Sequence, residues 1–168
     1  MIINEKLLIA AGAVAISAGV YTSAVTAATV TANAAANVVE GLIISENNGG
    51  MDFGDVSEAG LGTVILDTGG GRTATGGADV LVGGGEQAGQ YRITGEDGKA
   101  YTITFGAATI SEGGGDTMTV DTFVHTADGT AAAAPAGELF DLGATLHIGA
   151  GQTPGGYSGT YTITVEYN

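Results

Sequence analysis

The sequence of 168 residues contains no cysteine and no tryptophan, and it is poor in basic residues. Without cysteine, neither a disulfide nor a thiolate metal site can form, so stability has to come from hydrogen-bonded sheets and an apolar core. Only 4 Lys and Arg stand against 18 Asp and Glu, which gives a formal net charge of −14. This charge disfavours nucleic acid and anionic membrane surfaces as partners, because their phosphates attract Lys and Arg.

The abundant residues point to a β-rich protein. The chain has 31 Gly, and Thr, Val and Ala are frequent, whereas only 13% of its residues are charged. Thr and Val favour strands, and Gly favours the tight turns between them. With aromatic residues at 6%, the core is expected to consist largely of Val, Ile, Leu and Ala. The length suits one domain with a sizeable core.

Residues 1–27 are predicted to be a secretory signal peptide. Lys6 lies in a short N-terminal n-region, and residues 7–20 are apolar and small. Val25-Thr26-Ala27 has the small-x-small pattern of a cleavage site. The alternative is an uncleaved helix that anchors the chain in a membrane. Cleavage would place the mature protein outside the cytoplasm.

The most regular stretch runs from Tyr157 to Asn168. Every second residue belongs to one face, while the intervening residues are mostly Ser, Thr and Glu. This period of two is typical of a strand with one face in a core, and we expect the strand to be central and to specify its own register. The core-facing residues are Tyr157, Gly159, Tyr161, Ile163, Val165 and Tyr167.

A second alternating stretch covers residues 28–39, and its apolar side chains are small. One interpretation is the first strand of the domain. The other is a donor arm that inserts into the groove of a neighbouring molecule, a recognised mode of strand addition. Glu40 and Gly41 interrupt the pattern, so the sandwich domain is expected over residues 40–168. The donor residues would be Val30, Ala32, Ala34, Ala36 and Val38.

The body of the chain alternates short apolar runs with clusters of Gly, Asn and Asp. Glu96-Asp97-Gly98 predicts a hairpin between strands at 90–94 and 101–105, because Asp-Gly suits tight hairpin turns. In total we expect roughly eight to ten strands and no convincing helix after residue 28. The fold class is therefore predicted to be all-β, an immunoglobulin-like antiparallel sandwich with Greek-key connections. Further strands are expected at 63–67, 79–82, 117–124 and 139–148.

The sequence does not favour an enzyme. His125 and His147 have no His or Cys partner at a zinc-binding spacing, and His147 is expected to face solvent beside the inward Leu146 and Ile148. Neither a nucleophile elbow nor a phosphate-binding loop is present. The acidic turns at 96–98 and 112–116 lack the spacing of an ordered Ca²⁺ site, so solvated turns are the default. No catalytic residue, metal site, cofactor or small-molecule substrate is predicted.

Four segments, taken in order, resemble a family of secreted bacterial domains of unknown function (number 4402). The resemblance covers most of the chain, from about Thr29 to Asn168. The segments are fairly specific in this order, although each is of low complexity. They are Met51-Asp52-Phe53-Gly54, the glycine-rich run 71–77, Thr117 to Phe123, and the ending 156–168.

The ending also resembles subunits of chaperone–usher pili and the related spore-coat-U-like proteins. Those subunits typically end in an alternating strand with a penultimate Tyr, here Tyr167, and a Gly near its start, here Gly155, Gly156 or Gly159. The resemblance implies a sandwich that lacks one strand. It also implies a periplasmic chaperone and an outer-membrane usher as partners, and replacement of the missing strand by the N-terminal arm of the next copy.

Two functional hypotheses follow. The first is a structural subunit of a bacterial surface filament, exported through the periplasm to the cell surface or fimbrium. It would polymerise with copies of itself through the donor arm, whose acceptor is the groove beside the terminal strand. The alternative is a self-complete secreted sandwich that acts as an adhesin or surface-layer binding module, with residues 29–38 folded back as its first strand.

Overall fold

The computed structural model describes residues 27–57, 60–113 and 115–168. The predicted signal peptide lies outside the described residues except for Ala27. The chain divides into two units at Ala36, and all the strands lie in the second, Asn37–Asn168. All regular structure in the described part of the chain is strand, and no described helix is long and apolar enough to cross a membrane.

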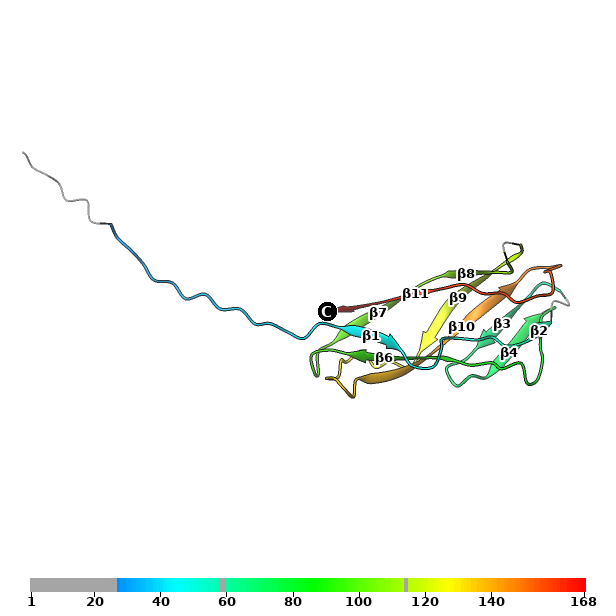
Figure 1. Cartoon of the computed structure of the whole chain (residues 1–168), viewed down its shortest axis with the longest axis horizontal. Helices are drawn as coiled ribbons and strands as arrows, with labels where there is room; N and C mark the ends of the chain where they lie inside the picture. Colours follow the sequence, from blue (N-terminus) through cyan, green and yellow to red (C-terminus); the bar gives the residue numbers. More distant parts are fainter. Residues whose placement is uncertain (1–26, 58–59, 114) are drawn as a thin grey trace, which may run out of the picture. The chain divides into compact units, whose positions relative to one another are not determined.

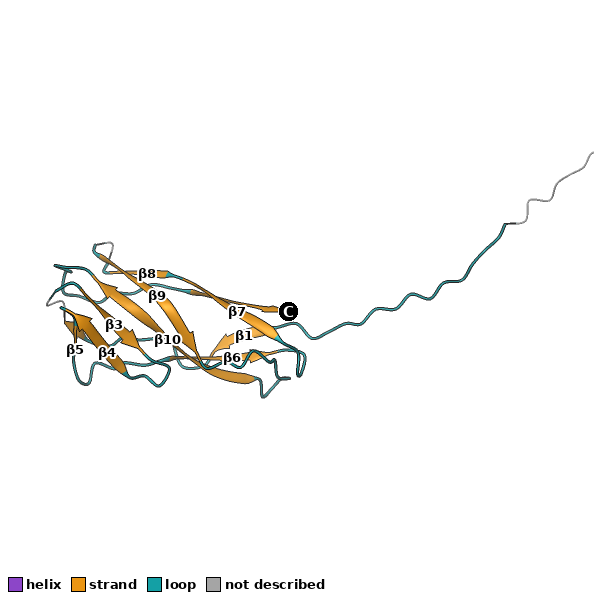
Figure 2. Ribbon diagram, turned by 180° about the vertical axis from the view of Figure 1, so that it is seen from behind, coloured by secondary structure: helices purple, strands orange, loops and turns teal. Residues whose placement is uncertain are grey.

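Eleven strands form the second unit (Figures 1 and 2). Most are short and are bounded by Gly-containing turns, as the composition predicts. In chain order they are β1 (Ile43–Glu46), β2 (Val56–Ser57), β3 (Gly62–Leu66), β4 (Arg72–Gly76), β5 (Asp79–Val80), β6 (Gly89–Thr94), β7 (Tyr101–Gly106), β8 (Ala108–Ser111), β9 (Thr117–His125), β10 (Glu138–Ile148) and β11 (Thr162–Tyr167).

The longest strand, β10, organises the larger sheet. One edge of β10 pairs with β9, and the other pairs first with β6 and then with β3, all antiparallel. The sheet continues outward from β6 to β1 and from β3 to β4. The long alternating pattern of β10 explains its central position in the sheet. Leu142, Ala144, Leu146 and Ile148 are all buried on one face, as predicted.

The smaller layer is made by β7 and β11, which pair antiparallel over six residues. Beyond β11 the ladder is extended by a bridge between Ser158 and Ser111, at the end of β8. Strand β8 pairs with β9 and so joins this layer to the larger sheet. The molecule is an all-β antiparallel sandwich, as predicted.

The core between the layers has two clusters of buried residues. One gathers around the second half of β10, with Val64, Met118 and Leu146; the other gathers around its first half, with Ile93 and Phe140. Phe123 and Tyr161 pack against both clusters. These two aromatic residues therefore make one continuous core from two halves.

A turn forms at Glu96-Asp97-Gly98, but the predicted hairpin is wrong because the strands on either side of the turn do not pair with each other. The turn exists, with Gly98 at φ 74° and the Lys99 amide donating to the Glu96 carbonyl over 3.1 Å. However, β6 pairs with β1 and β10, whereas β7 pairs with β11. The turn carries the chain from one layer to the other, so Tyr91 and Tyr101 belong to one core cluster from opposite sheets.

The apolar face of β9 was ambiguous in sequence because the strand changes phase. Thr122 has a φ of 51°, and the register against β10 shifts between Gly143 and Thr145. Such an irregularity lets residues of different parity face the same side. Met118 and Val120 are buried before it, and Phe123 packs on the core after it.

One expectation about the ends of the domain is corrected. The terminal strand is an edge strand instead of a central one, because β11 pairs only with β7 among the described strands and its core-facing residues are only half-buried. Residues 27–42 form no strand, and the first strand of the domain starts at Ile43. Alternation predicts which face of a strand is buried but not how many neighbours the strand has.

Candidate functional site: an unfilled groove between two strand edges

Strands β1 and β11 each present an unpaired edge. Among the described residues, β1 is paired only through its β6 side and β11 only through its β7 side. Ile44 of β1 and Ile163 of β11 line the same hollow, which places the two open edges on either side of it. Unpaired edges are the usual template for an added strand.

This hollow, the groove, has a volume of about 390 Å³. The hydroxyls of Tyr91 and Tyr161, which both line it, are hydrogen-bonded to each other. The Met51 amide also donates to the Tyr161 oxygen. A chain of hydrogen bonds therefore crosses the groove from β6 to the segment just before β11.

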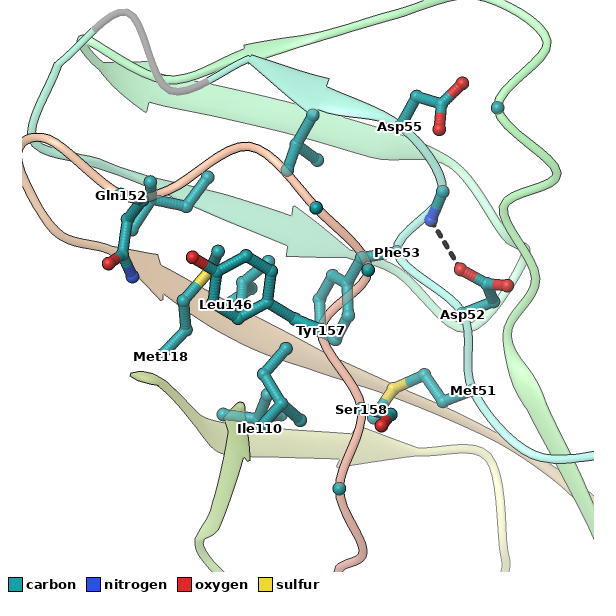
Figure 3. Close-up of a pocket in the computed structure, with 18 of the residues that line it drawn as sticks. Met51, Asp52, Phe53, Asp55, Ile110, Met118, Leu146, Gln152, Tyr157 and Ser158 are labelled. Carbon is teal, nitrogen blue, oxygen red and sulfur yellow. Dashed lines mark hydrogen bonds between the residues drawn. The ribbon is translucent and has the colours of Figure 1, made fainter. Parts of the chain in front are cut away.

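A second hollow, the cavity, continues from the groove and has a volume of about 690 Å³. Met51, Gly159 and Tyr161 line both spaces. In Figure 3 the side chains of Phe53, Met118 and Tyr157 converge on this space, whereas Asp55 points away from it. Other apolar residues that line the cavity are Val56, Ala108, Ile110, Val120, Leu146 and Ile148.

One wall of the cavity is held by a buried guanidinium. The Arg72 side chain is 4% exposed and donates to the carbonyls of Phe53, Asp55 and Leu81 at 2.6–2.9 Å. It also forms an ion pair of 3.1 Å with Glu86. Three carbonyls and one carboxylate satisfy the charge, and in return the guanidinium fixes the 53–55 segment in place.

The C-terminal end of β11 is hydrogen-bonded to the segment where the chain enters the domain. The Tyr167 hydroxyl donates to the Glu40 carbonyl over 2.8 Å and accepts the Glu96 amide over 2.6 Å. Leu42 and the Tyr167 hydroxyl both crowd the site where a Cβ on Gly95 would lie. The chain therefore enters the domain beside the C-terminal end of β11 (Figure 1).

The groove and the cavity together form one trough, and four of the six predicted acceptor residues line it: Tyr157, Gly159, Tyr161 and Ile163. Tyr157 and Tyr161 pack on the first core cluster, and Tyr161, Ile163, Val165 and Tyr167 on the second, so these five face inward as predicted. Gly159 is exposed, and a Cβ there would lie 2.4 Å from the Thr109 carbonyl oxygen. Gly159 is thus needed for the close approach of two backbones, not for an apolar face.

The predicted donor residues contribute nothing to the core of the domain. Every residue from 27 to 40 is exposed, including Val30 and Val38 at 91% each. The pairing of this arm, within the chain or with another copy, stays a prediction.

Sequence reasoning missed the opposite wall of the trough. Met51 and Phe53 were noted only as part of a resemblance, and Tyr91 only as a member of a hairpin. One feature of the sequence points to Arg72: it is one of only 4 basic residues in the chain. An isolated Arg in a glycine-rich stretch has few carboxylate partners nearby in sequence, so backbone carbonyls are its natural acceptors.

The two histidines and the acidic turns have structural partners. His147 faces outward as predicted and lies 2.8 Å from the Asp121 carboxylate, which lowers the pKa of Asp121. The Asp116 carboxylate accepts from the amide and hydroxyl of Thr153, and these bonds lower its pKa. Among the described residues, no three His, Asp or Glu side chains gather as a metal site would require.

The tyrosine pair predicts alkaline sensitivity. Burial and the bond to Tyr161 raise the pKa of Tyr91 well above its ordinary value of 10, so folding favours the neutral hydroxyl. This contribution is complete below about pH 10 and is lost as the pH rises towards the folded-state pKa, by roughly 1.4 kcal/mol per pH unit. Urea unfolding between pH 8 and pH 11 should show the loss, and Tyr91→Phe should reduce its slope. An unchanged slope in the variant would contradict this origin.

Comparison with known proteins identifies a family. The family described as "Domain of unknown function (DUF4402)" matches residues 42–167, which cover the whole domain from just before β1 to the end of β11. No curated protein and no solved structure matches the chain.

Proposed function

The chain belongs to the DUF4402 family, and from its open groove we propose that it is a structural subunit of a bacterial surface filament. Each copy accepts the N-terminal arm of another copy as an added strand between β1 and β11. The observation that carries the proposal is the pair of unpaired edges that face one trough. A strand inserted there gains ladder hydrogen bonds on both sides and buries alternate side chains.

The arm fits the trough in length. Residues 28–38 are eleven residues long, the same as the stretch 157–167 that borders the trough. In extended form either stretch spans about 36 Å. The arm also alternates small apolar with polar residues, as a strand with one buried face requires.

The position of the chain entry favours one polarity. Glu40 is fixed beside Tyr167, so each copy's own arm starts at that end of the trough. An inserted arm that runs antiparallel to β11 has its residue 38 at the Tyr157 end. The donor's domain then lies beyond the Tyr157 end, away from the acceptor's own arm at the Tyr167 end. Repeating this arrangement gives an open head-to-tail chain. The reverse polarity would crowd two domains at one end.

Charge is consistent with assembly through the arm. Residues 27–39 contain no charged side chain, whereas the chain as a whole carries −14. An uncharged arm enters the groove without repulsion from the acidic domain, while the domains themselves repel each other. Export to the cell surface, with a periplasmic chaperone and an usher as further partners, completes the proposal.

Deleting residues 28–38 tests it. The full chain should form filaments in electron micrographs, and the deletion variant should remain a folded, soluble monomer, because these residues contribute nothing to the core. Circular dichroism and sedimentation velocity measure the two properties, and N-terminal sequencing of the filament subunit locates the cleavage site. Unfolding of the deletion variant would remove the main support for the donor arm.

A second candidate function is a secreted binding module, such as an adhesin or surface-layer component. The cavity of about 690 Å³ favours it, since ligand pockets commonly measure about 300–1,000 Å³. Purified full chain that stays monomeric under all assembly conditions would favour this module over the filament subunit.

A further inference from the structure

Tyr161 stands at the boundary between the groove and the cavity, since it lines both. A strand that follows the whole trough has to pass over its ring. The ring is fixed from three directions: its oxygen binds the Tyr91 hydroxyl and the Met51 amide, and its face packs on Phe123 at a centroid distance of 5.6 Å. Tyr161 therefore limits how deep a side chain can reach at this point.

The two hollows on either side of this ring differ in volume. Towards the Tyr157 end lies the cavity of about 690 Å³, and towards Ile163 lies the smaller groove of about 390 Å³. A strand that fits both needs a small side chain over Tyr161 and has room for larger ones elsewhere. Close-packed interiors tolerate an added methylene poorly where no void exists.

The inward side chains of the arm are small throughout, with alanine at 28, 32, 34 and 36 and valine at 30 and 38. When residues 28–38 are laid antiparallel against 157–167, Ala34 falls opposite Tyr161. Val38 then falls opposite Tyr157 at the cavity, and Val30 falls opposite Val165. The inward residues of the arm thus meet the inward residues of the acceptor, with alanine at the narrow point.

We propose that Tyr161, held by Tyr91 and Met51, is a size filter that makes the groove specific for the alanine-containing arm of a second copy of this chain. Strands with a large residue over the ring are excluded. This inference rests on the proposed filament function and adds the residue that decides which strand is accepted.

Two leucine variants of the full chain test the filter. Ala34→Leu enlarges the residue over Tyr161, and we expect filament formation to fall by about tenfold or more. Asn33→Leu makes a similar change on the opposite, outward face of the arm and should reduce assembly much less than Ala34→Leu does. Both residues are exposed in a segment without strands, so neither change disturbs folding of the domain. Assembly is followed by pelleting and by counting filaments in electron micrographs.

The outcomes separate the filter from the filament function. Filaments of Ala34→Leu equal to the wild type, or an equal loss in both variants, would overturn the filter while leaving donor-arm assembly standing. A wild-type chain that forms no filaments would overturn both. The double variant Ala34→Leu/Tyr161→Leu, once shown to be folded by circular dichroism, should recover assembly, and failure to recover would exclude Tyr161 as the limiting residue.

Discussion

Replacing Arg72 with Met is expected to destabilise the domain by about 3–5 kcal/mol, because it breaks a buried and fully hydrogen-bonded charge. The guanidinium is 4% exposed and serves the carbonyls of Phe53, Asp55 and Leu81. Methionine preserves much of the side-chain volume but donates no hydrogen bond. The carbonyls of Phe53 and Leu81 then lose this donor, whereas the Asp55 carbonyl keeps the Leu81 amide. The Glu86 carboxylate also loses its ion-pair partner.

The matched control is Arg92→Met. Arg92 is only partly buried, and its guanidinium donates to a single carbonyl, that of Ala136. We expect its loss to cost less than about 1 kcal/mol, the usual value of one exposed interaction. Urea unfolding of both variants measures the difference. Equal and small effects would mean that Arg72 does not hold the 53–55 segment.

The same substitution should affect the trough. The 53–55 segment forms a wall of the cavity, and its position depends on Arg72. Under the proposed donor-arm assembly, a loosened wall deprives the arm of part of a preformed surface, because the wall then has to become ordered on binding. Filament formation by folded Arg72→Met should therefore fall below that of Arg92→Met.

Gly159→Ala is expected to destabilise the domain by about 1–3 kcal/mol through steric overlap. An added Cβ would lie 2.4 Å from the Thr109 carbonyl oxygen and 3.0 Å from the Ile110 Cα, both backbone atoms that cannot move aside cheaply. The segment has to shift away from β8 and strains the two bonds between Ser111 and Ser158, which measure 2.9 and 3.0 Å. Tyr157 and Tyr161 would move with it.

Gly156→Ala is the control for this substitution. A Cβ on Gly156 meets nothing within 4 Å, so the change should be nearly neutral. Thermal unfolding compares the stability of the two variants, and electron microscopy compares their filaments. If Gly159→Ala were as stable as Gly156→Ala, the close contact between the 157–161 segment and β8 would be excluded.

Local patterns predicted individual strands well. The segments assigned to β3, β9 and β10 agree with the structure within a few residues, and the inward residues of β10 are as expected. The reason is that a strand with one buried face alternates apolar and polar residues, so the buried face can be identified from the sequence of the strand alone. Strands β4 and β8 were not predicted, because each carries too few large apolar residues for such a pattern.

Pairing was predicted less well. Glu96-Asp97-Gly98 forms a turn, yet the strands on either side belong to opposite layers. A tight turn fixes the direction of the chain but not the partner of each strand, which depends on competition among all edges for the same neighbours. Strand β6 is satisfied by β10 and β1, so no edge remains for β7.

By itself, the sequence determined that this protein is an all-β sandwich without disulfides, that its last strand turns Ile163, Val165 and Tyr167 inward, and that residues 28–38 could serve as a complementary strand. Each of these follows from composition or from a local period of two. Only the tertiary structure decided that β11 is an edge strand, that β1 lies across an open trough from it, and that Tyr161 divides the trough. Those features arise where segments distant in sequence meet, and no local pattern encodes such a meeting.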